Sequence, residues 1–514
     1  MLTKKRNINM KRLKFIFVAL CSVILFAGCS NEETPGLSFS HNGLYFQWGG
    51  EPQVVTYTVV DIATVELKSS TEGWTAVVDH STKSVTITPP ADPETEEKRD
   101  AMRDAEIKIS ATSPEGTVSY YTIYAYVVGD SIIYLAEGGK YANCYVVTKP
   151  KSAYKLDVTH NGAGQKLADV ADVKILWQSD YNLLEHFSYD ATDGLVSFYI
   201  DALVDEDDED VYIKENGEFV IYEGNAVIAA KDSSDNIIWS WHLWLCKENP
   251  LTEYSTYSNG VTFMNRNLGA FANSNGATGD NDLIWRSYGL YYQWGRKDPF
   301  LRPYYHDCAG GQDDFACDAS GNSVSIEIAE CSTETGNVAY TIANPMTFIT
   351  NTACVDADNA DGIGDWLTTA DSSLWSGTTK TQYDPCPYGW RVPAGSDFDC
   401  LSLIDEEDSM SLDVARGRFG WMFTDGTNSH FYLGAGFRSY YDGVIHNMNY
   451  KTDVYPSQPE PWEGYYWTAG VTSNGKQSTC LYFDLTTTRS INKFNLNYPS
   501  KRANAMQIRC VKVN

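Results

Sequence analysis

The stretch IIWSWHLWLC, residues 237–246, is the plainest structural signal in this chain of 514 residues. Every second residue from Ile237 onward is apolar, and Trp244 adds an apolar side chain to the opposite face. Successive side chains of a β-strand point to opposite faces, so a strand that is apolar on both is expected at the centre of a sheet. We therefore expect His242, within this stretch, to be a packed, hydrogen-bonded core residue and not a metal ligand or a base.

This strand closes a β-rich connector domain that we assign to residues 131–250. The domain begins with the run SIIY at 131–134. Its segments YANCYVV at 141–147 and GNAVIA at 224–229 resemble a connector module that is commonly found ahead of the C-terminal domain described below. The acidic run at 205–210 lies between predicted strands and is expected to be a solvated loop.

Residues 37–130 show the alternation of polar and apolar residues that is typical of short, half-buried strands. The predicted strands are residues 53–60, 74–78, 84–88, 105–110 and 117–128. Such strands, separated by turn residues, predict an immunoglobulin-like β-sandwich without the paired cysteines of antibody domains. The LSF segment at 37–39, the GG turn at 49–50 and the PP loop at 89–90 resemble BACON-like sandwich modules of Bacteroidetes surface proteins.

Residues 1–28 have the order of a secretory signal peptide. Six basic and no acidic residues precede an apolar run that is too short to span a bilayer comfortably. The FAGC tetrad ending at Cys29 resembles a lipobox, although its first position is usually aliphatic. We expect cleavage before Cys29, acylation of that cysteine and a tether at residues 29–36. Met10 is followed at once by KRLK, so translation starts at either Met1 or Met10.

The segment SNEE at 30–33 resembles the acidic tag that directs Bacteroidetes lipoproteins to the outer face of the outer membrane. We therefore expect a lipid-anchored outer-membrane protein that faces the cell exterior. Its contact with the membrane is expected to run through the lipid anchor only.

Composition narrows the classes of function. The formal net charge is -28, and loss of the signal peptide would bring it to -34. A field of this sign repels phosphate backbones, so no nucleic-acid partner is expected. Tyr (34 residues), Trp (14) and Gly (39) are abundant whereas His (8) is scarce. This balance favours β-structure with aromatic surfaces over a histidine-based catalytic or zinc site.

Beyond about residue 254, Trp and Gly pairs recur within long loops. The segments that stand out are MNRNLGA at 264–270, GLYYQWGRKDP at 289–299, NPMTF at 344–348, DPCPYGWRVP at 384–393, GAGFR at 434–438, YYWT at 465–468 and QIRCVK at 507–512. Together they resemble the Fibrobacter succinogenes major paralogous domain, FISUMP, which we assign to residues 251–514. The resemblance implies a loop-rich α+β domain related to the C-type lectin fold. The expected fold class is therefore mainly β and multidomain.

Ten cysteines follow Cys29 in a chain that is expected to mature in an oxidising compartment, so disulfides are expected. Prolines on both sides hold Cys386 in an extended conformation, and Cys510 lies in an alternating terminal strand, so we predict a bond between them. We also predict a Cys144–Cys246 bond, because these residues lie on strands near the two ends of the connector domain. A further group is expected to cross-link one long loop, with open connectivity: Cys308, Cys317, Cys331 and Cys354.

Ligand binding is expected on the loops of the FISUMP domain, because loops on a rigid scaffold carry function more often than the scaffold does. Aromatic rings offer a large contact area for stacking on a sugar at low entropic cost. The candidate ligand-binding residues are Trp294, Arg296, Asp298, Trp375, Trp390, Arg391, Arg438 and Trp467. The alternative is that these tryptophans form the core of the domain.

Three acidic residues, Asp356, Asp358 and Asp361, have nearly the spacing of a calcium loop. They miss the EF-hand register by one residue and lack the closing glutamate. We favour a plain acidic turn over a calcium site and expect no cofactor.

The sequence contains no motif of a serine hydrolase, a zinc protease or a P-loop. The paired carboxylates of a glycoside hydrolase stay open, since their separation is invisible in a sequence. We predict a non-catalytic binding or adhesion protein whose FISUMP domain binds a glycan or another cell-surface ligand. The alternatives are a fimbrial tip or envelope scaffold protein that recognises protein, and a glycan-active hydrolase. The identity of the ligand and the oligomeric state stay open.

Overall fold

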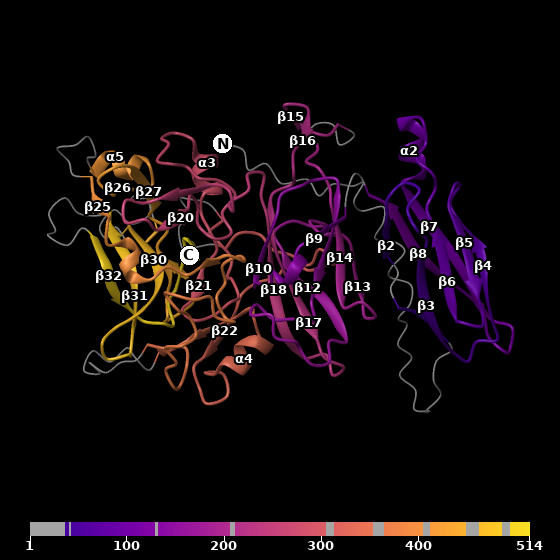
Figure 1. Cartoon of the computed structure of the whole chain (residues 1–514). Helices are drawn as coiled ribbons and strands as arrows, with labels where there is room; N and C mark the ends of the chain where they lie inside the picture. Colours follow the sequence, from indigo (N-terminus) through magenta and orange to yellow (C-terminus); the bar gives the residue numbers. More distant parts are fainter. Residues whose placement is uncertain are drawn as a thin grey trace. The chain divides into compact units, whose positions relative to one another are not determined.

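The computed structural model describes residues 36–40, 43–128, 132–205, 211–304, 313–352, 364–404, 412–448, 462–485 and 494–513. The chain is mainly β and multidomain, as predicted (Figure 1). Unit 1 combines Met1–Leu135, Lys149–Val158 and Tyr181–Tyr222. Unit 2 combines Ala136–Thr148, Thr159–Asp180 and Glu223–Asn514. None of the helices within the described ranges has the length and apolar character needed to cross a membrane.

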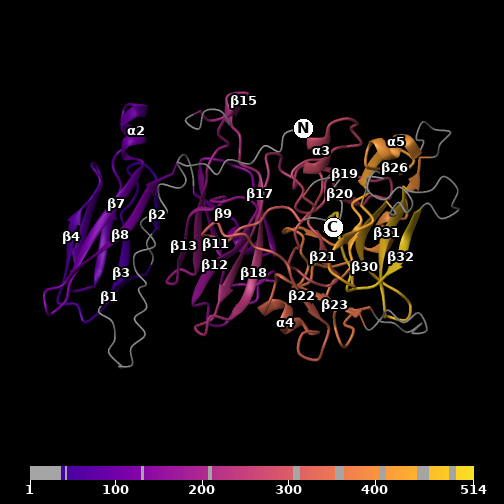
Figure 2. The same cartoon turned by 180° about the vertical axis from the view of Figure 1, so that it is seen from behind.

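The N-terminal part of unit 1 is a sandwich of two four-stranded sheets (Figures 1 and 2). One sheet has the order β1 (Gly36–Phe39), β3 (Gln53–Val60), β6 (Ser84–Thr88) and β5 (Thr75–Asp79). The other has the order β2 (Gly43–Phe46), β8 (Val118–Val127), β7 (Asp104–Thr112) and β4 (Thr64–Ser69). Both sheets contribute to one core, in which Val55, Ile107 and Ile123 are fully buried. The predicted immunoglobulin-like sandwich is confirmed.

Alternating hydrophobicity located the five predicted strands of this sandwich to within two residues at each end. In β7 every second side chain, from Ala105 to Ala111, is buried. The alternation of apolar and polar residues along this strand therefore identifies the face that packs in the core. Helix α2 (Glu96–Met102) was not predicted. It is a short helix whose N-cap Thr95 accepts a hydrogen bond from the backbone N–H of Lys98.

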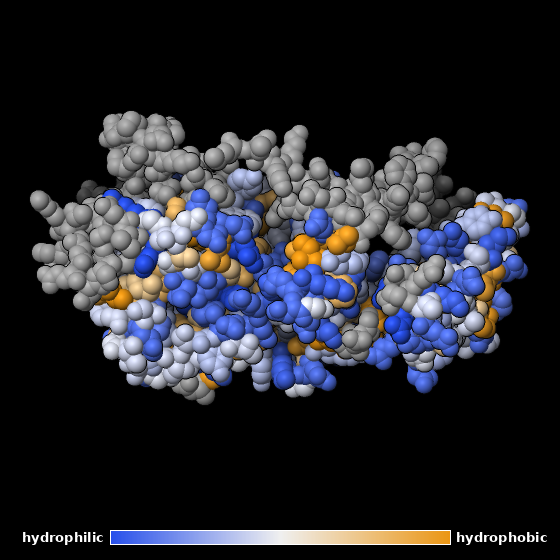
Figure 3. All heavy atoms as spheres, turned by 90° about the horizontal axis from the view of Figure 1, so that it is seen from above, coloured by the Kyte–Doolittle hydropathy of each residue, from blue (hydrophilic) through white to orange (hydrophobic). Residues whose placement is uncertain are grey.

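The rest of unit 1 is a sheet and a hairpin. The sheet has the order β13 (Glu185–Asp190), β14 (Leu195–Ile200), β11 (Ser152–Asp157) and β9 (Ile132–Tyr134). The hairpin joins β15 (Lys214–Glu215) and β16 (Glu218–Phe219). Val211 and Phe219 at the hairpin are 49% and 38% exposed. In the view of Figure 3, exposed hydrophobic residues (orange) form small groups among hydrophilic ones (blue).

Unit 2 begins with a sheet of order β10 (Cys144–Val147), β18 (Ile237–Leu245), β17 (Gly224–Lys231) and β12 (Asp172–Gln178). The strand β18 is central, as its two apolar faces predicted. His242 is 2% exposed, and its Nε2 lies 2.9 Å from Oδ1 of Asn225. Burial lowers the pKa of His242 to about 3, so the ring is a neutral, packed core group as predicted.

The predicted bond between Cys144 and Cys246 is wrong. Strands β10 and β18 run parallel, with Cys144 opposite His242 and Val147 opposite Leu245. Cys246 therefore lies four residues along the pair from Cys144, roughly 13 Å at about 3.3 Å per residue. A disulfide needs Cα atoms within about 7 Å. Both thiols are buried and unbonded, because the strands are neighbours but their register separates the sulfur atoms.

The C-terminal part of unit 2 consists of short strands, short helices and long connections. Its sheets are β19 (Tyr254–Thr256), β20 (Thr262–Met264), β34 (Val511–Lys512) and β24 (Trp390–Arg391); β21 (Tyr292–Gln293), β33 (Ala505–Met506), β28 (Phe437–Arg438) and β29 (Ile445–His446); β22 (Glu327–Glu330) and β23 (Thr347–Thr350); β25 (Ser402–Leu403), β26 (Gly420–Thr424) and β27 (Ser429–Leu433); and β30 (Glu463–Val471), β31 (Ser478–Asp484) and β32 (Phe494–Ser500). Its helices are α3 (Asn281–Arg286), α4 (Val338–Ala343) and α5 (Leu412–Gly417). The loop-rich α+β character agrees with the sequence, whereas the relation to the C-type lectin fold stays a prediction.

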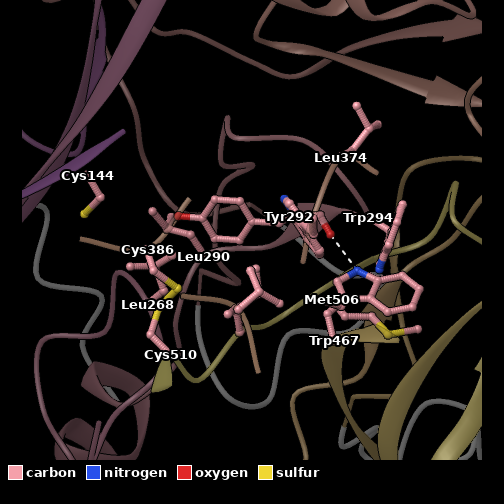
Figure 4. Packing of buried hydrophobic residues seen from close by; sticks show 14 of the residues in the cluster. Cys144, Leu268, Leu290, Tyr292, Trp294, Leu374, Cys386, Trp467, Met506 and Cys510 are labelled. Carbon is pink, nitrogen blue, oxygen red and sulfur yellow. Dashed lines mark hydrogen bonds between the residues drawn. A yellow bond between two sulfur atoms is a disulfide. The ribbon is translucent and has the colours of Figure 1, made fainter. Parts of the chain in front are cut away.

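The Cys386–Cys510 disulfide is present, as predicted. It lies in the largest buried cluster of unit 2, together with Leu268, Leu290 and Tyr292 (Figure 4). The bond joins two segments that are 124 residues apart in the sequence. It therefore closes the last half or so of the C-terminal part of unit 2 into one covalent loop.

Buried hydrogen bonds join the sheet around β18 to the C-terminal part of unit 2. Asn143 Nδ2 donates to the carbonyl of Asp384 at 2.9 Å, and Asn225 Nδ2 donates to the carbonyl of Gly269 at 3.0 Å. The compact units accordingly depart from the domain boundaries predicted near residues 130 and 250. Half of the predicted connector folds with the N-terminal sandwich in unit 1, and the other half folds with the C-terminal residues in unit 2.

Candidate functional site

All eight residues predicted to bind a ligand are buried. Their exposed fractions run from 0% for Trp294 and Trp467 to 8% for Arg391, with the remaining five between these values. The exposed stacking platform predicted from the sequence is therefore wrong. The tryptophans form the core instead, which was the alternative.

Hydrogen bonds of the indole N–H groups fix these tryptophans in the interior. Trp294 donates to the carbonyl of Thr468 at 2.9 Å, and Trp467 donates to the carbonyl of Tyr292 at 2.8 Å (Figure 4). The ring of Trp375 lies 5.6 Å from that of Trp294. A buried indole with a bonded N–H is a structural anchor, because both its apolar area and its donor are already used.

The charged candidates are buried because each has a partner. Asp298 Oδ1 accepts from Lys297 Nζ at 2.7 Å and from Ser240 Oγ at 2.6 Å. Lys297 Nζ also lies 4.6 Å from the centre of the Trp239 ring. The predicted arginines are paired in the same way, as Arg296 with Gln293, Arg391 with Asp397 and Arg438 with Asp313. These groups hold segments together and are not free to bind a ligand.

The predicted calcium loop lies outside the described residues, and so do the lipidation site Cys29 and the cysteines Cys308 and Cys354. Within the part of the chain that the structure describes, no group of three or more His, Cys, Asp or Glu is placed to hold a metal ion.

A partly exposed aromatic group lies on the sheet of β30, β31 and β32. Tyr482 and Tyr498 stack with ring centres 4.6 Å apart and planes at 27°. Tyr465 packs against Tyr482 with ring centres 5.1 Å apart. Tyr498 is 37% exposed, whereas Tyr465 is buried. We call Tyr465, Tyr482 and Tyr498 the tyrosine face.

Strand register assembles the tyrosine face. Tyr465 lies opposite Tyr482 in the β30–β31 pair, and Tyr498 lies opposite Cys480 in the β31–β32 pair. Residues two apart on a strand share a face, so Tyr482 and Tyr498 are diagonal neighbours on one side of the sheet. The register of β31 against β32 shifts between Cys480 and Tyr482.

A carboxylate lies at the edge of the tyrosine face. Glu463 Oε2 accepts from the Tyr465 hydroxyl at 2.6 Å, and Glu463 Oε1 accepts from the Tyr482 hydroxyl at 2.8 Å. Asn447 Nδ2 donates to Oε2 as well. A carboxylate has about four acceptor positions, so at least one position of the half-buried Glu463 is left for a further donor.

Burial, followed by the charge of Glu463, raises the pKa of all three tyrosines of the face. The phenols are therefore neutral hydroxyl groups at every ordinary pH. The arrangement offers ring faces, hydroxyl groups and the acceptor oxygens of one carboxyl group. These are the groups that a binding site for a partly apolar, hydroxyl-rich ligand requires.

Sequence reasoning missed the tyrosine face because it ranked tryptophan first. Tryptophan is highly buried on average, whereas tyrosine combines an apolar ring with a polar tip that reaches water or a partner. A signal was present in FNLNYPS at 494–500, where apolar and Asn residues alternate up to Tyr498 on a strand at the edge of its sheet.

No family model and no curated protein sequence matches the chain. Among solved structures, the human desmocollin-1 ectodomain is 9% identical, with a TM-score of 0.14, and the match covers 41% of this chain and 40% of that one. Drosophila N-cadherin EC1-4 is 14% identical, with a TM-score of 0.15, covering 41% and 49%. An endo-fucoidan hydrolase of glycoside hydrolase family 107 is 12% identical, with a TM-score of 0.13, covering 42% and 29%. The chain spans less than half the length of each of these proteins, and likenesses of this size carry no argument about function.

Proposed function

We propose that this protein is a non-catalytic, surface-exposed binding protein that recognises glycans through the tyrosine face of unit 2. The observation that carries the proposal is the stacked Tyr482–Tyr498 pair, partly exposed and edged by the carboxylate of Glu463. The proposed binding site therefore consists of these tyrosines and not of the buried tryptophans, but it still lies within residues 251–514.

The chemistry of a pyranose suits this surface. One face of the ring carries C–H groups that pack on an aromatic ring, and tyrosine supplies a large contact area with little loss of entropy. The sugar hydroxyls donate hydrogen bonds, and an ionised carboxylate accepts them more strongly than a neutral group does. A neutral sugar therefore matches both parts of the site.

We propose the context of the site from the sequence. The lipobox-like segment and the acidic tag support acylation at Cys29 and display on the exterior of the outer membrane. The seven segments quoted above support membership of residues 251–514 in the FISUMP family. Replacing Cys29 by alanine is expected to move the protein from the membrane fraction to the soluble fraction, since the acyl chains supply the membrane affinity.

The test of the binding function uses the whole chain after its signal peptide, with Cys29→Ala to prevent acylation, on an array of neutral glycans. The variant Tyr498→Ala is expected to weaken binding by about tenfold, the equivalent of about 1.4 kcal/mol for one stacked ring. The matched control is Tyr120→Ala, which removes a tyrosine that is 64% exposed on β8 of unit 1.

Each outcome separates the proposed function from its alternatives. Equal binding by both tyrosine variants and the unchanged chain would exclude the tyrosine face as the site. Cleavage of a bound glycan would place the protein among hydrolases. Adhesion to a deglycosylated protein surface, with no glycan bound, would favour a scaffold that recognises protein.

A further inference from the structure

The tyrosine face continues into a longer row of aromatic rings. Phe437 on β28 packs edge-on against Tyr465, with ring centres 5.0 Å apart and planes at 70°. The ring of His446 on β29 lies 6.4 Å from that of Phe437. We call His446, Phe437 and the three residues of the tyrosine face the aromatic row.

Strand pairing places these rings side by side. Phe437 lies opposite His446 in the β28–β29 pair. A parallel bridge joins Gly436 to Gly464. The next residues along both strands, Phe437 and Tyr465, are therefore neighbours as well. The aromatic row thus crosses five strands, which at about 4.8 Å between neighbours gives it a length of roughly 19 Å.

The two ends of the aromatic row are its exposed parts. Tyr498 is 37% exposed and the side chain of His446 is 36% exposed, whereas Tyr465 at the centre is 7% exposed. Phe437 and Tyr482 are half-buried. The row therefore offers two stacking positions, one at each end, on either side of a closed centre.

Hydrogen-bonding groups lie at that centre. Glu463 precedes Tyr465 by two residues on β30, so both side chains lie on one face of the sheet. The hydroxyls of Tyr465 and Tyr482 donate to the carboxyl group of Glu463. Asn447, which directly follows His446, donates to it from Nδ2. A ligand that reaches from one stacking position to the other therefore passes the half-buried Glu463.

We infer that the site binds a linear glycan of about four sugar rings along the aromatic row, and not a single terminal ring. This inference rests on the proposed function, because it extends the same site. The rings of an extended, β-linked glycan repeat at about the distance between neighbouring strands, so about four of them match the length of the row. Rings at the two ends of the glycan stack on the two stacking positions, and hydroxyl groups between them donate to Glu463.

The dependence of affinity on chain length tests this inference. The probes are three neutral series, β-1,4-linked glucose, mannose and xylose, each from the monosaccharide to the hexasaccharide. They are titrated calorimetrically into the whole chain after its signal peptide, with Cys29→Ala. In a series that binds, the affinity is expected to rise about tenfold from the disaccharide to the tetrasaccharide, because the longer glycan reaches the second stacking position. It should level off beyond that length.

Variants at the β29 end of the aromatic row locate the source of this gain. His446→Ala and Phe437→Leu are each expected to reduce the advantage of the tetrasaccharide over the disaccharide to about threefold or less. Leucine keeps apolar packing at residue 437 and removes only the ring. Circular dichroism melts check that both variants fold. Tyr441→Ala is the matched control and should keep the tenfold gain, because Tyr441 is 54% exposed between β28 and β29 but lies outside the row.

The outcomes separate this inference from the proposed function. An affinity that does not change with chain length would overturn the inference, and so would a gain that persists in both His446→Ala and Phe437→Leu. If none of the three series binds while the glycan array yields a ligand that depends on Tyr498, the extended site is wrong and the proposed function stands. If no glycan binds at all, both are wrong.

Discussion

Replacing Cys386 and Cys510 together by alanine is expected to lower the free energy of unfolding of unit 2 by about 5 kcal/mol. The bond joins residues 124 apart in the sequence. In the chain-entropy account, a closed loop of that length restricts the unfolded chain by about 4.9 kcal/mol at 25 °C. Both side chains are 0% exposed, so removal of the two sulfur atoms also removes packing contacts, and the control variant below measures a loss of that kind.

The assay is urea unfolding without reductant, followed by tryptophan fluorescence. Only Trp48 and Trp74 of the 14 tryptophans lie in unit 1, so the signal reports mainly on unit 2. The double variant is expected to unfold at roughly 1 M lower urea or more, given a typical dependence of a few kcal/mol per M. Cys246→Ala is the matched control, because it removes a buried thiol that is not bonded. A midpoint for the double variant equal to that of Cys246→Ala would refute the reasoning.

Three further predictions concern buried polar groups. Asp298→Ala is expected to destabilise unit 2 by about 3–5 kcal/mol in the same urea assay, because it leaves the ammonium of Lys297 buried and unpaired. Burial lowers the pKa of His186 from 6.5 to about 4; the unfolded chain therefore binds an extra proton between these values, and unit 1 loses stability as the pH falls through this window. Circular dichroism melts should show this loss, and His186→Phe should remove it. Residues 251–514 alone are expected to fold poorly, because this piece lacks the side-chain donors of Asn143 and Asn225. Its amide resonances should therefore be broad and poorly dispersed. In the full chain, which keeps the rest of unit 2 at residues 136–148, 159–180 and 223–250, the amide resonances of unit 2 should be sharp.

The sandwich was predictable from sequence because its physics is local. In a strand with one buried face every second residue is apolar, so the sequence itself shows which residues form the core, as in β7. The register between strands is not shown by the sequence pattern. It depends on turns, bulges and packing across the sheet, which is why Cys144 and Cys246 were placed on the correct strands but in the wrong mutual position.

The unit boundaries were unpredictable for a related reason. A boundary near residue 250 follows from the change of composition along the chain, but folding units are set by which buried polar groups find partners. The carbonyl of Ser240 on β18 accepts from Lys297, and its hydroxyl donates to Asp298. These buried hydrogen bonds hold β18 and the segment of Lys297 and Asp298 together in unit 2. A sequence shows that a lysine and an aspartate are adjacent, but not that a distant serine completes their hydrogen bonds.

The error at the candidate site has a general cause. The segments that carry the resemblance are rich in Trp, Arg and Asp, and in the structure these residues are the buried anchors of long loops. Most strands in this part of unit 2 are only two to five residues long, so many backbone carbonyls of the loops accept hydrogen bonds from side chains, as that of Thr468 does from the indole N–H of Trp294. Segments that define such a fold are therefore poor guides to what it binds. Tyr482 and Tyr498 lie outside every one of those segments, and Tyr498 is 37% exposed on its strand, so the ligand should be sought at residues of that kind.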